Sequence, residues 1–127
     1  MSNDEEPWQK SPRYTELTVG LETEGCVRPL VSRELSDGTL KFLCLAASLL
    51  SPRPTTLIAL NEPESSLHPD LLPALAELIV NAAKTSQVWV STHSTILSES
   101  IKALSRAQPI RLQLVNGETI IEQEEDE

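Results

Sequence analysis

The sequence predicts an α/β fold in which parallel strands are flanked by helices, with a β-hairpin at each end. Two short apolar runs, 55–60 and 87–91, are each bounded by polar and turn-forming residues, as buried strands are. Amphipathic helical patterns lie before, between and after these runs. This alternation of strand and helix is typical of a parallel sheet with crossover helices.

The first predicted element is an N-terminal hairpin. Residues 15–22 alternate in character, Glu24 and Gly25 offer a turn, and residues 26–31 are again strand-like. The first helix is then predicted over 39–50, because apolar residues recur there at helical spacing and Ser51-Pro52 ends the pattern. The residues expected on its buried face are Leu40, Leu43, Cys44, Ala47 and Leu50.

The run 55–60 is enclosed by turn formers, so we expect a central strand that is covered on both faces. A second helix follows, and Pro73 limits how early it begins, since only the first turn tolerates a missing N–H donor. The residues expected on its apolar face are Leu71, Leu72, Leu75, Leu78, Ile79 and Ala82.

The last third of the chain predicts a strand at 87–91, a helix at 95–104 and a C-terminal hairpin. The hairpin strands are 110–115 and 119–122, and Asn116-Gly117 between them is the strongest turn signal in the chain.

Composition restricts the function. The 127 residues carry a net charge of -9, which argues against direct nucleic-acid contact by this chain, since gripping phosphates needs clustered Lys and Arg. Much of the acid lies in segments 4–6 and 122–127, so we expect a polar disordered tail at 1–13 and an acidic tail at 123–127. The chain has no apolar stretch long enough to span a bilayer.

The two cysteines, Cys26 and Cys44, are not spaced as a redox or metal-binding pair. We expect both thiols to be reduced and structural, and the protein to be cytoplasmic and free of membrane partners.

Three short motifs carry the chemistry. The first, Leu35 to Thr39, reads Leu-Ser-Asp-Gly-Thr and lies directly before a helix. Ser36 or Asp37 can cap that helix, and Gly38 lets the backbone approach a ligand closely. The free N–H groups and the positive end of the helix dipole then form an anion site. Caps of this type also open many helices that bind nothing.

The second motif is the apolar run Leu57 to Leu60, followed by Asn61 and Glu62. An acid placed after such a strand can act as a general base, or can position water, for attack on a γ-phosphate. Asn61 occupies the place of a Mg²⁺-supporting acid but offers an uncharged oxygen, so metal support should be weak. The alternative is that these residues are only the turn that leaves the strand.

The third motif is Ser91 to Ser94, which places His93 just past a strand end, where it can hydrogen-bond a phosphate or the attacking water. A histidine at this place can equally be incidental. The other histidine, His68 before Pro69, is expected to be a turn or cap residue.

Together these motifs resemble the C-terminal half of an ATP-binding-cassette-type ATPase head, in the branch of RecF-like, structural-maintenance-of-chromosomes-like (SMC-like) and predicted AAA-type ATPases. The resemblance covers about Glu34 to Ile101. It matches 35–39 to the signature loop, 57–62 to the Walker B strand, 65–69 to the D-loop and His93 to the switch histidine.

The resemblance implies a partial P-loop NTPase sheet within residues 14–122. It also implies a composite site in which ATP and Mg²⁺ are held between two heads. Glu62 and His93 would be catalytic for nucleotide on this half of the sheet. Residues 36–39 (Ser36, Asp37, Gly38 and Thr39) would face nucleotide that is bound by a partner, and Ser66 would lie along the dimer seam.

One departure from the family pattern is large. No Gly-x-x-x-x-Gly-Lys-Ser/Thr loop is present, since the sequence has only four glycines and none precedes a lysine. In the family the strand before that loop lies between the strands that correspond here to 88–91 and 110–115. We therefore expect a collapsed sheet or association with another chain, and no ATP hydrolysis by the isolated chain.

Three interpretations remain open. In the first, the chain contributes to ATP binding and hydrolysis together with a second ATPase head or another chain that bears a phosphate loop. A homo-oligomer of this chain is one form that such an assembly could take. Alternatively, it is a catalytically inactive remnant that acts as a dimerisation or regulatory module, which Asn61 favours. In the third, it is a small binding domain of unrelated purpose.

Overall fold

The computed structural model describes residues 20–25, 27–31 and 35–122. The chain divides into two compact units, Met1–Leu35 and Ser36–Glu127, and each is described by itself. The predicted tails at both ends lie outside the described residues.

In the first unit, β1 (Gly20–Leu21) pairs antiparallel with β2 (Leu30–Val31). Gly25 lies between them with a φ of 89°, a left-handed conformation that glycine adopts without strain. The N-terminal hairpin is therefore confirmed for the part of the chain that the structure describes.

The second unit is built around β3 (Leu57–Asn61) and β4 (Gln87–Ser91), which pair in parallel from Leu57↔Gln87 to Asn61↔Ser91. The backbone ladder continues past the strand end, where the Glu62 N–H donates to the Ser91 carbonyl at 2.8 Å. Because the two strands end level, the residues after them emerge at the same edge of the sheet.

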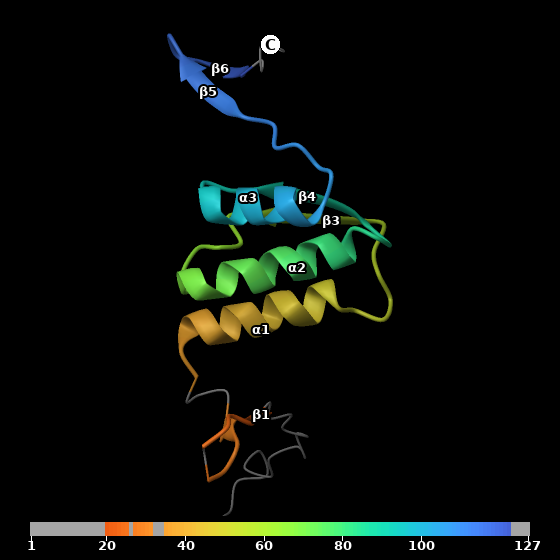
Figure 1. The fold of residues 1–127 in the computed structure, drawn as a ribbon, viewed down its shortest axis with the longest axis vertical. Helices are drawn as coiled ribbons and strands as arrows, with labels where there is room; N and C mark the ends of the chain where they lie inside the picture. The colour runs from red at the N-terminus through yellow and green to blue at the C-terminus, as the bar shows by residue number, and fades with distance from the viewer. Residues whose placement is uncertain (1–19, 26, 32–34, 123–127) are drawn as a thin grey trace, which may run out of the picture. The chain divides into compact units, whose positions relative to one another are not determined.

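Three helices accompany this pair: α1 (Asp37–Leu49), α2 (Leu72–Ala82) and α3 (Thr95–Leu104). Figure 1 shows α2 between α1 and α3, and α2 contacts both neighbours. The bounds of α1 and α3 agree with the predicted 39–50 and 95–104 to within two residues, and α2 spans the residues predicted for the second helix from Leu72 to Ala82.

The helix starts have clear local causes. Ser36 caps α1 by accepting from the Thr39 N–H at 3.1 Å, and Ser94 caps α3 by accepting from the Leu97 N–H at 3.2 Å. Before α2, His68 caps the 3₁₀ helix η3 (Pro69–Leu71) through Nδ1, which confirms that His68 is a cap residue.

The core lies where the three helices meet the inner face of the β3–β4 pair. It centres on α2, whose predicted apolar face is confirmed, and includes one residue each of α1 and α3. The buried members are Leu49, Leu75, Ala76, Ile79, Ala82 and Leu97, and the strand residues packed on them are Ile58, Leu60, Val88 and Val90.

The predicted buried face of α1 is wrong. The helix packs on the core through Phe42, Leu45 and Leu49, whereas Cys44 and Ala47 of the predicted face are exposed. The helix has two apolar stripes, one with Phe42, Leu45 and Leu49 and the other with Cys44 and Ala47. Periodicity alone does not show which of the two packs on the core.

The expectation that the strand at 55–60 is covered on both faces is also wrong within the described residues. Both β3 and β4 alternate between exposed and partly buried positions, because the packing helices cover one face only. On the other face Leu57 is 55% exposed and Trp89 is 68% exposed. We call this outer surface, formed by Leu57, Ala59 and Trp89, the open face.

The C-terminal hairpin is confirmed as β5 (Leu112–Val115) and β6 (Glu118–Ile121). Asn116 and Gly117 have φ values of 50° and 87°, as the two central residues of a type I′ turn require. In the described ranges β5 pairs only with β6, so the alternation does not continue into one sheet: each of the three sheets has two strands.

Candidate functional site

Glu62 and His93 meet at the edge where β3 and β4 end. Glu62 Oε1 lies 3.1 Å from His93 Nε2, and the two side chains are 47% and 89% exposed. An ion pair in such an exposed position adds little to folding stability. A carboxylate in contact with a solvent-accessible imidazole can, however, transfer a proton or orient a water molecule.

The backbone at Glu62 is unusual. Its φ is 45°, a left-handed conformation that few non-glycine residues adopt. Such conformations cost of order 1–3 kcal/mol and cluster at functional sites. Ser66, four residues later, has a φ of 66°, so the loop between them turns sharply at both of its ends.

Asn61 faces β4. Its Oδ1 accepts a hydrogen bond of 2.6 Å from the Ser91 hydroxyl, across the last pair of the parallel register. Within the described residues no three His, Cys, Asp or Glu side chains gather as metal ligands. Asn61 offers one amide oxygen, and this oxygen already accepts a hydrogen bond. The described residues alone therefore do not supply the oxygen ligands that a Mg²⁺ site needs.

Glu64 joins the two loops that follow the strands. Its Oε1 accepts from the Thr92 hydroxyl at 2.5 Å and from the His93 N–H at 3.0 Å, while Oε2 is buried without a hydrogen-bond partner. Burial by itself would raise the pKa of Glu64. The hydrogen bonds from Thr92 and from the backbone of residues 64, 93 and 94 outweigh burial, so the net effect lowers this pKa.

The start of α1, where an anion site is predicted, has an intact helix cap. The Ser36 hydroxyl accepts from the Thr39 N–H and lies 2.8 Å from the Thr39 hydroxyl. Asp37 is exposed in the first helical turn. If Thr39 donates to Ser36, the Ser36 proton remains able to donate to an oxygen on another molecule.

Gly38 allows the start of α1 to approach the loop that contains Ser66. A Cβ at position 38 would lie 2.5 Å from the Ser66 carbonyl oxygen, which is closer than real contacts allow. The glycine is therefore required by packing within this chain, and the signature-like segment 36–39 abuts the segment that resembles a D-loop.

Lys41 reinforces this junction. Its Nζ donates to the Ser65 carbonyl at 2.7 Å, to the Ser65 hydroxyl at 3.2 Å and to the Glu62 carbonyl at 3.4 Å. One side chain of α1 thus contacts both the residue after β3 and the turn beyond it.

The structure brings Glu62 to His93 and Gly38 to Ser66, whereas among the described residues no hydrogen bond or ion pair joins 36–39 directly to Glu62 or His93. Sequence reasoning missed Lys41 and Glu64. A signal for Lys41 existed, because it lies one helical turn after Gly38 on the same helix.

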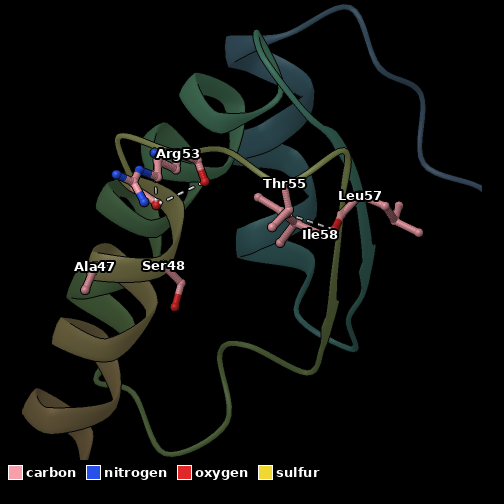
Figure 2. Close-up of a pocket in the computed structure, with 7 residues that line it drawn as sticks. Ala47, Ser48, Arg53, Thr55, Leu57 and Ile58 are labelled. Carbon is pink, nitrogen blue, oxygen red and sulfur yellow. Dashed lines mark hydrogen bonds between the residues drawn. The ribbon is translucent and has the colours of Figure 1, made fainter.

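A separate pocket lies at the opposite end of β3. It has a volume of about 470 Å³ and is lined by the end of α1, the loop that contains Arg53, and the start of β3. Figure 2 shows Leu57 pointing away from Ala47 and Ser48 on α1. Because Leu57 begins the strand that ends beside Glu62, this pocket is not part of the Glu62–His93 site.

The fold is similar to that of a solved ATPase structure. A solved structure from work on ATP-driven dimerization and DNA-stimulated activation of SMC ATPases is similar, with a TM-score of 0.66 over 88% of this chain and 67% of that one. The two sequences are 18% identical, so this match concerns the fold. The chain therefore has the mixed α/β fold of SMC ATPases, in the form of a partial P-loop sheet.

A protein-family model then identifies the family. Residues 2–99 match the family described as "AAA domain, putative AbiEii toxin, Type IV TA system", and the chain belongs to this family. No curated protein matches the chain. The family and the fold together make this an AAA-family, ATPase-like domain, a class that generally uses nucleotide with Mg²⁺. Of the helices that the structure describes, none has the length and apolar character to cross a membrane.

Proposed function

We propose that this chain forms part of an ATPase head in which Glu62 and His93 act on ATP held by a phosphate-binding loop from outside residues 1–127. The single observation that carries the proposal is the 3.1 Å contact between Glu62 and His93, beyond the level ends of two parallel strands. The loop would come from a partner chain or from further sequence of the same protein.

The chemistry assigned to the pair is simple. Glu62 accepts a proton from a water molecule, or orients it, as that water attacks the γ-phosphate. His93 Nε2 contacts the carboxylate, and a proton on Nδ1 would let the other side of the ring donate to a phosphate oxygen. Both side chains face solvent, which leaves room for the triphosphate that a phosphate loop would bring.

A second head is part of the proposal. Ser36 and Gly38 would face a γ-phosphate bound on the other head, and Ser66 would lie along the seam between heads. The support is the junction of α1 with the loop after β3. Gly38 lies against the Ser66 carbonyl and Lys41 donates to the Ser65 carbonyl, so the two segments lie side by side. The similar SMC ATPase structure, from work on ATP-driven dimerization, is consistent with pairing of heads.

ATP affinity of the isolated chain should be poor. A phosphate loop supplies a nest of backbone N–H groups and a lysine to the β- and γ-phosphates, and residues 1–127 have no such loop. Mg²⁺ would neutralise phosphate charge in a complete site. Since Asn61 gives at most one uncharged oxygen, the loop-bearing part would have to supply the other protein ligands.

One observation favours a second candidate, an inactive dimerisation or regulatory module. Asn61 Oδ1 is held by Ser91, so the position that would support Mg²⁺ acts as a structural cross-link between β3 and β4. In this alternative, Gly38, Lys41 and Ser66 would maintain a docking edge without turnover.

The test is reconstitution. The tagged chain captures partners from its own cell extract with Mg²⁺ and a non-hydrolysable ATP analogue, and a captured protein with a Gly-x-x-x-x-Gly-Lys-Ser/Thr loop is then purified with it. We expect the pair to hydrolyse ATP, and Glu62→Gln to reduce kcat by about a hundredfold or more. Glu77→Gln, which changes an exposed carboxylate on α2, is the matched control.

Two results would contradict the proposal. One is robust ATP turnover by the purified 127-residue chain alone. The other is a reconstituted pair whose activity is the same with Glu62 and with Gln at this position, which would favour the inactive module.

A further inference from the structure

We infer that Glu64 is a positioning residue: it fixes the turn after β4 so that the His93 ring meets Glu62. The inference rests on the proposed function for the meaning of the Glu62–His93 pair, but its geometry is independent of nucleotide. Neither the sequence motifs nor the family match assigns a role to this carboxylate.

The contacts of Glu64 with the turn are specific. One oxygen, Oε1, accepts from both the Thr92 hydroxyl and the His93 backbone N–H. The second bond is made by the residue whose imidazole contacts Glu62. Glu64 therefore acts on the backbone of His93, and the ring direction follows from that backbone.

The network continues into the next helix. The Thr92 hydroxyl gives its only proton to Glu64 and accepts from the Ser94 N–H at 2.9 Å, while the Ser94 hydroxyl caps α3. Each bond in this series polarises the next. A single carboxylate on the loop after β3 thus determines the path of the chain from the end of β4 to the start of α3.

The site needs such a support because the Glu62–His93 contact cannot hold itself. The His93 and Glu62 side chains are 89% and 47% exposed, and an ion pair with this exposure contributes little and costs rotamer freedom. Glu64 is partly buried, as Glu62 is, but its Oε1 accepts two hydrogen bonds and its Oε2 is shielded from water. Hydrogen bonds to an ionised carboxylate are stronger than those between neutral groups.

The path of the backbone after β3 explains why the Glu64 carboxylate, and not that of Glu62, reaches the turn after β4. Glu62 is in the left-handed conformation, so the chain direction changes there and the following residues fold back toward the end of β4. Pro63 is buried between the two glutamates. One glutamate then projects outward to the imidazole, and the other projects inward to the backbone beneath it.

NMR spectroscopy of the complete chain, without nucleotide, tests the inference. Glu64→Ala removes the acceptor, Glu64→Gln keeps an uncharged oxygen of the same size, and Glu77→Ala removes an exposed carboxylate elsewhere. The readouts are nuclear Overhauser contacts between the His93 ring and the Glu62 side chain, and hydrogen exchange at the His93 amide.

We expect Glu64→Ala to abolish the ring contacts and to speed exchange at the His93 amide by about tenfold or more. Glu64→Gln should restore part of both signals, and Glu77→Ala should leave them unchanged. Persistence of the contacts and of amide protection in folded Glu64→Ala would overturn the inference. Equal losses in Glu77→Ala would overturn it too, since they would indicate general loosening.

If Glu64→Ala does not fold, comparing Thr92→Val with Thr92→Ser tests the positioning role of Glu64 instead. Valine removes the hydroxyl that bridges Glu64 and Ser94, and serine retains it. Loss of the ring contacts in the valine variant alone supports the inference, and retention in both overturns it.

The two proposals fail separately. If Glu62→Gln leaves ATP hydrolysis of the reconstituted pair unchanged, the proposed function fails, and the NMR result still stands for Glu64. If Glu62→Gln abolishes hydrolysis but the ring contacts survive in Glu64→Ala, only the positioning role fails. When both hold, Glu64→Ala should lower kcat in the pair with little change in the KM for ATP.

Discussion

At the scale of single residues, the asparagine that ends β3 and the two glutamates that follow it have different roles. Asn61 fastens β3 to β4 through Ser91, Glu62 faces solvent and His93, and Glu64 binds the turn after β4. The sequence places all three within four positions, and only the left-handed backbone at Glu62 separates their directions.

Acid should weaken the fold through Glu64. Its folded-state pKa lies below the ordinary value near 4.5, so its stabilising effect is complete above that value and is lost as the pH falls through the lower folded-state pKa. The neighbouring titratable groups are Glu62 and His93. We expect the difference in unfolding free energy between the native chain and Glu64→Gln to be largest near pH 7.

Urea unfolding at pH 7 and pH 3 measures this difference. It should shrink at pH 3, because protonation makes the native carboxyl resemble the amide. A difference that is equal at both pH values would show that the Glu64 charge does not stabilise the fold.

Gly38 should resist substitution by alanine. In an ordinary helix this change stabilises by about 0.5–1 kcal/mol. Here the new Cβ would meet the Ser66 carbonyl at 2.5 Å, so the helix and loop must separate, and we expect a loss of about 1–3 kcal/mol. Urea unfolding measures it, and Ser48→Ala at an exposed position of α1 serves as control. A stabilised Gly38→Ala would mean that the close approach is absent in solution.

At the scale of elements, the helix starts and the C-terminal turn could be predicted because local signals determine them. Ser36, Ser94 and Pro73 mark helix starts, and Asn116-Gly117 marks the hairpin. The buried face of α1 could not be predicted, since the helix is apolar on two stripes and only tertiary packing selects one of them.

The same limit applies to the site. Glu62 and His93 could be proposed because each follows an apolar strand, and parallel strands bring their ends together. The roles of Lys41 and Glu64 depend on how a loop turns back on itself. That turn depends on positive φ values at Glu62 and Ser66, which neither residue type favours.

The C-terminal hairpin should depend on its turn glycine. Gly117 has a φ of 87°, so Gly117→Ala should cost the hairpin about 1–2 kcal/mol. All residues of β5 and β6 are exposed, so the thermal midpoint of the core should change little.

Hydrogen exchange at the β5 and β6 amides measures the loss, and Asn116→Gly, which keeps positive φ accessible, is the control. A matching fall in the midpoint of the core would show that the hairpin is integrated with it.

At the scale of the whole molecule, the β3–β4 pair is incomplete. Parallel sheets in proteins are almost always covered on both faces. Here one face is covered by helices and the open face exposes Leu57 and Trp89. In the proposed function, a part that supplies the phosphate loop would add a strand at an edge of this pair, and the helix that follows such a loop would lie against a face of the sheet. The open face is the face that remains for that helix.

Trp89 should report the covering of the open face. The chain has two tryptophans, and Trp8→Phe leaves Trp89 as the only indole. With 68% of Trp89 exposed, emission should be that of an indole in water. Adding the loop-bearing partner should shift it to shorter wavelength. Trp89→Phe, which leaves Trp8 alone, is the control, and an unshifted spectrum in a verified complex would show that the partner binds elsewhere.

The open face also has a cellular consequence. Exposed apolar residues beside unpaired strand edges are features that promote aggregation, and cells continuously remove such chains through chaperones and proteases. The lifetime of this protein in the cell should therefore follow the supply of whatever covers Leu57 and Trp89. Its abundance would then be matched to that of its partner without any control at the level of the gene.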